Sequence, residues 1–322
     1  MYFKKTENYT VIPNNLNQVF AVSNKILTSK PELVEMKLEG DLSNVNVAIL
    51  SFLFKQNYAT YQQVVEFCRI QGFYFSNGAV SDYLLQRALD KMLKCRLLNK
   101  FFLSDEEQPS VVPVFPEDAQ VFYCICTGGV QLLENYDGGV EVYGWDCTSM
   151  CKVSDHISRD IAATQFYLRL LDSVADKMKY FNLSPLYVVR TNNNTYPLKA
   201  SFECMVQQPG EVRYFISDVF REGDSINRVR DKLYGKERLL NTKFYKKYFP
   251  DAPKIPNYIA IVENERVLKD VAREIEEGYR NKLDCWYILD EYMNRSFRDK
   301  VFLTYNYDEM QFIPSMVRVF AS

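Results

Sequence analysis

The chain has 322 residues, of which 47% are hydrophobic and 15% aromatic, and its formal net charge is −2. This composition excludes a disordered or fibrous protein, and the length indicates two or three compact domains. No stretch approaches the roughly 18 consecutive apolar residues that a membrane span requires, so we expect no membrane partner. Eight cysteines in a chain of this length are too widely spread for a disulfide framework. We therefore expect a cytoplasmic protein with reduced thiols.

The net charge hides an uneven distribution along the chain. Residues 45–105 are basic, residues 106–160 are strongly acidic, and residues 228–247 are strongly basic. Opposite local charges cancel in a sum, so a net charge near zero does not exclude a nucleic-acid partner.

Three helices are predicted after a short extended arm over residues 1–42. The stretch "SNVNVAILSFLFKQ" begins a helix with Ser43 as N-cap, and "ATYQQVVEFCRIQG" begins a second with Thr60 as N-cap and Gly72 as the stop. In "SNGAVSDYLLQRALDKMLKCRLL" apolar residues recur with a period near 3.6, including Leu84, which we expect to point inward. The following "LLNKFFLSDEEQPSVVPVF" predicts a strand, a polar turn and a second strand.

This order is typical of a winged helix-turn-helix, whose third helix offers side chains to a DNA groove. We expect double-stranded DNA to be contacted by outward-facing residues of the third helix and of the wing strand: Ser81, Gln86, Arg87, Lys91, Lys94 and Lys100. Winged helices also serve as protein-docking modules, and Asp82 and Asp90 on the same helix weaken the phosphate-binding argument.

The middle of the chain predicts a connection to a sheet domain. "QVFYCICTGGVQLLENYD" predicts a strand, a tight Gly-Gly turn and a short helix. A long helix follows over residues 158–179, with Ser154 or Ser158 as its cap.

From Leu186 the hydrophobic period becomes that of strands. Helices are expected over residues 225–240 and 264–278, and hairpin turns at "TNNNT" and "QQPGE". The five strand-like runs are "LYVVR", "YPLKASFECMV", "EVRYFISDVF", "NYIAIV" and "DCWYILD". The fold class is therefore α+β or α/β, with mixed strands about a central sheet.

Two fragments resemble the replication-relaxation family of plasmid and integrative-element proteins. "FYCICTGGVQLLENY" is similar to the family's strand, threonine-glycine turn and leucine-rich helix, and "YFISDVFREGDSINRVRDKL" to its strand, acid and basic helix. "IPNYIAIVENERVLKDVAREI" resembles the later strand and helix, so the similarity covers about residues 45–280. The positions that match are Asp218, Arg221, Asp224, Ser225, Lys232 and Leu233.

The resemblance implies a winged helix followed by a domain similar to a PD-(D/E)XK nuclease core. It divides the chain into an arm (1–42), a winged-helix domain with the following strand, turn and helix (43–150), and a nuclease-like α/β domain (151–322). Family members are associated with replication or conjugative transfer of mobile DNA, often without a demonstrated activity. The implied function is that of a DNA-binding accessory protein with replication or conjugation proteins as partners.

Cleavage of DNA would require two or three carboxylates on Mg²⁺ and a lysine near the attacking water. Glu203 and Asp218 fall on adjacent predicted strands, but Phe220 stands two residues after Asp218, where a lysine is expected. Arg221 has the opposite strand parity. A structural cluster is the favoured alternative, in which Ser225 or Asp224 caps the next helix and Arg221 pairs with an acid. We expect an accessory protein that does not cut DNA, with a Mg²⁺-dependent endonuclease as the alternative.

A second nucleic-acid contact is predicted in the basic block. Arg228, Lys232 and Lys236 recur at helical spacing and share a predicted exposed face. In "NTKFYKKYFPDAPK" the cations Lys243, Lys246 and Lys247 alternate with aromatic residues that can stack on bases. The alternative is a solvated basic face beside core aromatics.

Zinc is a further candidate ligand. Cys124, Cys126, Cys147, Cys151 and His156 would suffice for a tetrahedral site, although their spacing is not that of a standard zinc knuckle. Buried thiols in a core strand are the competing interpretation. The chain lacks a phosphate-binding glycine loop, and one histidine excludes mechanisms that need two. A protein-interaction scaffold or a transcriptional regulator, docking a basic partner through the acidic block, is the remaining alternative.

Overall fold

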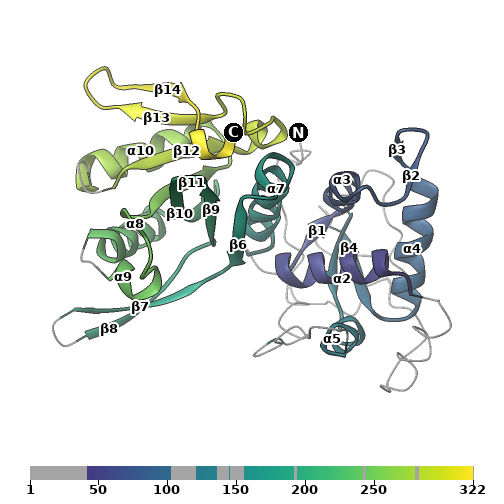
Figure 1. Cartoon of the computed structure of the whole chain (residues 1–322). Helices are drawn as coiled ribbons and strands as arrows, with labels where there is room; N and C mark the ends of the chain where they lie inside the picture. The colour runs from purple at the N-terminus through teal and green to yellow at the C-terminus, as the bar shows by residue number, and fades with distance from the viewer. Residues whose placement is uncertain are drawn as a thin grey trace. The chain divides into compact units, whose positions relative to one another are not determined.

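The computed structural model describes residues 42–102, 121–135, 145, 156–191, 194–241, 244–279 and 283–321. Over these residues the protein is α+β, with one mixed sheet and several antiparallel ones (Figure 1). Internal contacts divide the chain into two compact units, an N-terminal unit that ends at Thr164 and a C-terminal unit that begins at Gln165. The division falls inside a helix, whereas we expected a boundary near residue 150. Residues 1–41 of the predicted arm (1–42) lie outside the described residues.

The N-terminal unit combines helices with a three-stranded antiparallel sheet of order β1-β5-β4. Its elements are α2 (Asn44–Gln56), β1 (Ala59–Thr60), α3 (Tyr61–Gln71), β2 (Phe75–Ser76), β3 (Ala79–Val80), α4 (Asp82–Lys94), β4 (Leu98–Phe102), β5 (Val121–Ile125), α5 (Thr127–Glu134) and the first part of α7 (His156–Val174).

Local capping signals fix the ends of the first two helices. The side chains of Ser43 and Thr60 accept hydrogen bonds from the backbone N–H groups of Asn46 and Gln63, so both predicted N-caps are confirmed. Gly72 adopts a left-handed conformation with φ 69° and ends α3, as predicted.

The third helix begins later than the hydrophobic period suggests. Residues 75–80 form the small hairpin β2–β3, and Ser81 caps α4 by accepting a hydrogen bond from Leu84 N at 3.4 Å. Leu85 and Leu89 point into the core, whereas Leu84 is 40% exposed. The prediction that Leu84 points inward is therefore wrong.

The Gly-Gly pair lies inside a helix and not in a tight turn. Gly128 and Gly129 occupy the first turn of α5. A Cβ atom on Gly128 would lie 2.8 Å from the carbonyl oxygen of Arg96, and one on Gly129 would collide with that of Leu97. The glycines therefore allow α5 to approach the backbone before β4 closely.

The first part of α7 is tied to the α2–β1 and α3 segments by three side-chain hydrogen bonds. Asn57 Nδ2 donates to Asp160 Oδ2 at 3.0 Å, Thr164 Oγ1 donates to Tyr58 O at 2.9 Å, and Gln63 Nε2 donates to Ile161 O at 2.8 Å. Ser158 lies within the helix and does not cap it, and Ser154 lies outside the described residues. The helix ends at Val174 and not at residue 179, because the chain enters a strand at residue 178.

The C-terminal unit is built on a seven-stranded sheet of order β14-β13-β12-β11-β10-β9-β6. Its strands are β6 (Met178–Leu183), β9 (Phe202–Gln208), β10 (Glu211–Phe220), β11 (Asn257–Val262), β12 (Cys285–Leu289), β13 (Phe302–Asn306) and β14 (Gln311–Ser315). Strands β10, β11 and β12 are parallel, and the other pairs are antiparallel. The helical elements are α8 (Ile226–Asn241), α9 (Tyr245–Tyr248), α10 (Glu265–Tyr279), a 3-10 helix η2 (Asp290–Asn294) and α11 (Arg318–Ala321).

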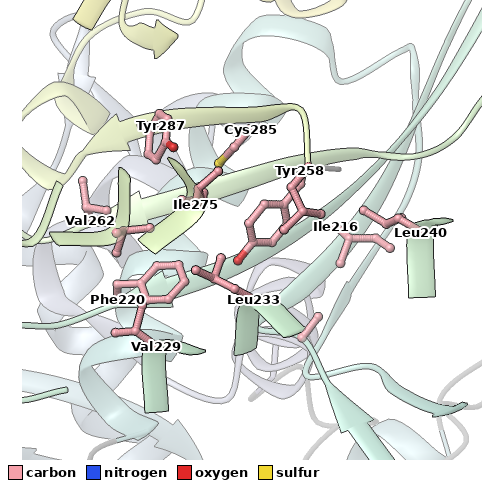
Figure 2. Close-up of a cluster of buried hydrophobic side chains, with 14 of the residues drawn as sticks. Ile216, Phe220, Val229, Leu233, Leu240, Tyr258, Val262, Ile275, Cys285 and Tyr287 are labelled. Carbon is pink, nitrogen blue, oxygen red and sulfur yellow. The ribbon is translucent and has the colours of Figure 1, made fainter. Parts of the chain in front are cut away.

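Helices cover both faces of the central strands. Tyr214 to Phe220 in β10 are all buried, as expected for a strand with two covered faces. On one face Ile216 packs with residues of α8 and α10, including Leu233 and Ile275 (Figure 2). On the other face Phe166 of α7 lies 4.8 Å, between ring centroids, from Phe202.

A separate two-stranded ribbon is formed by β7 (Leu186–Thr191) and β8 (Asn194–Lys199). The hydroxyl of Tyr248 accepts a hydrogen bond from Val188 N at 2.5 Å and donates one to Val188 O at 3.0 Å. The residue opposite Val188 is Pro197. A second proline, Pro314, lies in the edge strand β14, and the other edge strand, β6, carries a bulge near Lys179.

Candidate functional site

The outer face of α4 carries the predicted DNA-contacting residues. Gln86, Arg87 and Lys94 are exposed, and Lys91 and Lys100 are half-buried. The remaining candidate on this helix, Ser81, uses its hydroxyl as the N-cap.

Asp82 on the same helix has a partner inside the N-terminal unit. The hydroxyl of Tyr61 donates to Asp82 Oδ1 at 3.0 Å. Burial raises the pKa of Tyr61 to about 12, and the hydrogen bond to a carboxylate adds to the effect. This carboxylate therefore holds α4 against α3.

A buried ion pair lies between α8 and the sheet in the C-terminal unit. Lys236 Nζ is 2.7 Å from Asp218 Oδ2, and the exposed fractions of the two side chains are 0% and 2%. The ammonium also donates to Lys199 O at 2.9 Å, and the hydroxyl of Tyr258 donates to Asp218 Oδ2 at 3.0 Å. The charges of Lys236 and Asp218 are therefore satisfied within the core.

The prediction that Lys236 lies on an exposed basic face is wrong. It falls three residues after Leu233 and four before Leu240, so the helical period places it in the inward stripe of α8. That spacing is visible in the sequence. What the spacing does not reveal is the buried carboxylate that stabilises a charge at this position.

Glu203 and Asp218 lie on adjacent strands, as predicted, and on one face of the sheet. Glu203 pairs with Ile216, two residues from Asp218 in β10. Its oxygens accept hydrogen bonds from the Tyr187 hydroxyl at 2.5 Å and from Asn182 Nδ2 at 2.9 Å. Burial, and next the nearby Glu203 carboxylate, raise the pKa of Tyr187 well above its usual range.

This donor set does not fit a magnesium ion. Mg²⁺ takes carboxylate oxygens, but both oxygens of Glu203 and Oδ2 of Asp218 already accept hydrogen bonds from protein groups. A metal at Asp218 would have to displace the Lys236 ammonium from a site that is closed to solvent.

Arg221 and its neighbours form the structural cluster that the sequence favours. Arg221 Nη1 is 2.6 Å from Asp290 Oδ2, and both side chains are almost fully buried. Arg221 N donates to Asp224 Oδ2 at 3.0 Å, and Ser225 Oγ accepts from Arg228 N at 3.3 Å, so Ser225 caps α8. Burial raises the pKa of Asp290 to about 6, although Arg221 opposes that shift. Phe220, at the position where a lysine was sought, belongs to the core.

Two other cations of the basic block are also engaged within the unit. Arg228 Nε lies 3.3 Å from Asp224 Oδ1. Lys232 Nζ donates to Val219 O at 2.7 Å and lies 4.8 Å from the centre of the Phe220 ring. These contacts turn both side chains toward the start of α8, so the predicted outward basic face is not formed as expected.

The segment after α8 retains exposed positive charge. Lys246 and Lys247 are exposed; Lys246 Nζ donates to Ala252 O at 2.6 Å, and Lys247 lies 5.3 Å from the ring centre of Tyr248. The flanking aromatic residues Phe244, Tyr245 and Tyr248 pack against the core. Lys243 lies outside the described residues.

The structure describes three of the five predicted zinc ligands. Cys124 is buried in β5, Cys126 precedes the first turn of α5, and His156 is exposed at the start of α7. Cys147 and Cys151 lie outside the described residues. In the part of the chain that the structure describes, no three His, Cys, Asp or Glu side chains are grouped for metal binding. Among those same residues, no helix combines the length and apolar character needed to cross a bilayer.

Comparison with known proteins assigns the chain to no family. No protein-family model matches the chain, and no curated protein matches it. The crystal structure of protein VC1899 from Vibrio cholerae aligns with 82% of this chain at 10% sequence identity and a TM-score of 0.29. The aligned part is 54% of the Vibrio cholerae chain, so this chain spans about half its length. A similarity at this level supports no argument about function.

Proposed function

We propose that this chain is a cytoplasmic DNA-binding accessory protein of a mobile genetic element, acting in plasmid replication or conjugative transfer without cutting DNA. The observation that carries the proposal is the exposed face of α4, where Arg87, Lys91 and Lys94 follow one another along one helix. Cations arranged in this way bind the phosphates of duplex DNA. The association with mobile elements rests on the family resemblance described above.

The topology of the N-terminal unit supports a winged-helix interpretation. Three helices alternate with short strands, and β5 lies between β1 and β4 in an antiparallel sheet. In a winged helix-turn-helix the third helix enters the major groove, and here that helix is α4.

The C-terminal unit supports a nuclease-like domain without catalysis. Apart from the ribbon β7–β8 and the short helix α9, the element order is α7, β6, β9, β10, α8, β11, which agrees with the PD-(D/E)XK-like core that the resemblance implies. The carboxylates of Glu203 and Asp218 are occupied by tyrosine, asparagine and lysine donors. In this proposal the carboxylates of Glu203 and Asp218 stabilise the fold.

The test is a gel-shift titration with duplex DNA at low salt, comparing the full chain with Lys91→Glu/Lys94→Glu. We expect the double variant to lose binding and to keep its melting temperature within a few degrees. The matched control is Arg298→Glu/Lys300→Glu, which reverses two exposed charges in the C-terminal unit that are not predicted DNA contacts. A wild-type chain without affinity for duplex DNA, or a Lys91/Lys94 variant that binds normally, would contradict the proposal.

An endonuclease is the second candidate, and one observation favours it. Lys236 supplies, from α8, a lysine beside the Asp218 carboxylate, whereas the position two residues after Asp218 in β10 has none. Supercoiled plasmid incubated with Mg²⁺ or Mn²⁺ separates the two functions, with Glu203→Gln and Asp218→Asn as near-isosteric controls. Nicking by the wild type that both variants lose would favour the endonuclease, and intact plasmid would favour the accessory protein.

A further inference from the structure

Two large apolar side chains stand on the outside of α4. Tyr83 is 70% exposed and Leu84 is 40% exposed, and they are adjacent in the first turn of the helix. The core positions of the same helix are filled by Leu85, Leu89 and Met92, all of which are buried. The outward pair is therefore not needed to pack the N-terminal unit.

The types of side chain on the outer face of α4 differ between its N-terminal and C-terminal halves. Tyr83 and Arg87 are four residues apart and Lys94 is seven residues further, so these side chains lie in one row. Gln86 is exposed on one flank of this row, and Leu84 on the other. Planar, amide and apolar groups thus occupy the N-terminal half of the face, and the lysine ammonium groups occupy the C-terminal half.

These two sets of groups suit different parts of a DNA duplex. An arginine pairs with the O6 and N7 atoms of guanine, a glutamine pairs with adenine, and apolar groups contact the methyl group of thymine. A lysine ammonium is a point charge that follows phosphates without regard to sequence.

Resting on the proposed function, we infer that α4 reads bases with its N-terminal half and holds the phosphate backbone with its C-terminal half. Tyr83, Leu84, Gln86 and Arg87 determine the sequence preference. Lys91 and Lys94 supply affinity that is independent of sequence.

The two carboxylates on the helix have separate roles in this arrangement. Asp82 accepts the Tyr61 hydroxyl and belongs to the packing of α4. Asp90 is exposed three residues after Arg87, on the side that faces the duplex. Because it opposes phosphate, Asp90→Asn should tighten binding several-fold for every DNA sequence tested.

The experiment first selects preferred duplexes from a randomised pool with the full-length wild-type chain. Binding constants are then measured for the selected duplex and a scrambled duplex. Arg87→Lys, which keeps the charge, and Tyr83→Ala/Leu84→Ala should each lower the ratio of the two constants by about tenfold, the loss of one good base contact. Both should leave the scrambled-duplex constant within about twofold of wild type.

Lys94→Gln is the matched phosphate-contact variant. It should weaken binding to both duplexes equally and reduce the slope of log K against log salt by about 1. The inference is overturned if Arg87→Lys and Tyr83→Ala/Leu84→Ala keep the wild-type ratio, or if wild type binds every duplex equally well. It is also overturned if Tyr83→Ala/Leu84→Ala changes self-association in sedimentation but not the sequence preference. A wild type that binds no duplex at all would instead remove the proposed function itself.

Discussion

Burial removes the water molecules that would surround the Lys236 ammonium, and polar groups of the neighbouring strands take their place. The ammonium contacts Asp218 and the carbonyl oxygen of Lys199, and Tyr258 donates to the same carboxylate. Such a pair contributes little net stability compared with apolar residues of the same volume, but removing one partner leaves an uncompensated buried charge. The cluster therefore makes the fold depend on each of its members.

Lys236→Met should lower the free energy of unfolding by about 3–5 kcal/mol, because Asp218 then stays buried without its counter-charge. Urea denaturation followed by circular dichroism measures the change. Lys247→Met, at an exposed position on α9, is the control and should change stability by less than about 0.5 kcal/mol. Equal effects of the two substitutions would show that the ion pair is not needed for the fold.

Asp160 gives the N-terminal unit a pH-dependent stability. Burial raises the pKa of its carboxyl from 3.8 to about 7, although the hydrogen bond from Asn57 and the charge of Arg159 oppose the rise. Between pH 4 and pH 7 the folded state therefore binds more protons than the unfolded state, so stability falls as the pH rises through this window. The rise in pKa corresponds to at most about 4 kcal/mol.

Asp160→Asn should remove this dependence while keeping an acceptor for Asn57. Melting temperatures at pH 5 and pH 8 test this, and the variant should exceed the wild type at pH 8. Asp172→Asn, at an exposed carboxylate on the same helix, should leave the pH profile unchanged. A variant that is less stable than the wild type at pH 8 would mean that the ionised carboxylate stabilises the fold.

Helices and strands could be predicted where the signals are local. The caps at Ser43 and Thr60, the stop at Gly72 and the helices near 225–240 and 264–278 each depend on a few neighbouring residues. Strand β13 was not predicted. Strands β6 and β14 were also not predicted, since β6 contains a bulge and lacks strict alternation, and Pro314 interrupts the pattern of β14. These are edge strands, where packing imposes a weaker pattern on the sequence.

The candidate site could be predicted only in part, because many of its contacts join residues that are far apart in the sequence. The sequence places Glu203 and Asp218 on adjacent strands, and the observed pairing of Glu203 with Ile216 puts both on one face. The hydrogen-bond donors Tyr187, Tyr258 and Lys236 come from other parts of the chain. Contacts over such separations leave no local pattern, so Lys236 was assigned to the surface by its charge and by its spacing from Arg228 and Lys232.

The close approach of α5 to the backbone before β4 gives a test of one element. Gly129→Ala should destabilise the protein by about 1–3 kcal/mol, because its methyl group would collide with the Leu97 carbonyl. Gly278→Ala is the matched control on α10, where a Cβ meets no atom within 4 Å. It should stabilise the protein by up to about 1 kcal/mol through helix propensity. Denaturation midpoints of both variants would show opposite signs, and two equal shifts would contradict the close approach.

For the molecule as a whole, the two units share the helix α7. The first part of α7 contributes buried Ile157 and Ile161 and the hydrogen bonds of Asp160 and Thr164 to the N-terminal unit. A domain boundary drawn before this helix would remove part of the core of the N-terminal unit.

A fragment of residues 42–164 should therefore show a cooperative thermal transition, and a fragment of residues 42–150 should not. Circular dichroism melts of the two fragments test the expectation. If the shorter fragment melts cooperatively at the same temperature as the longer one, α7 is not part of the N-terminal core.

The prolines opposite Val188 and in β14 affect whether strands of two copies of this protein can pair by main-chain hydrogen bonds. Because the N–H and C=O groups of Val188 point to Tyr248, Pro197 faces the free side of the ribbon and offers no N–H there. Pro314 likewise offers no amide hydrogen to an incoming strand. Each proline removes one main-chain hydrogen bond that an added strand would need, so strand addition is disfavoured at these two edges. Copies that meet at these edges would therefore contact one another through side chains, without a continuous sheet between them.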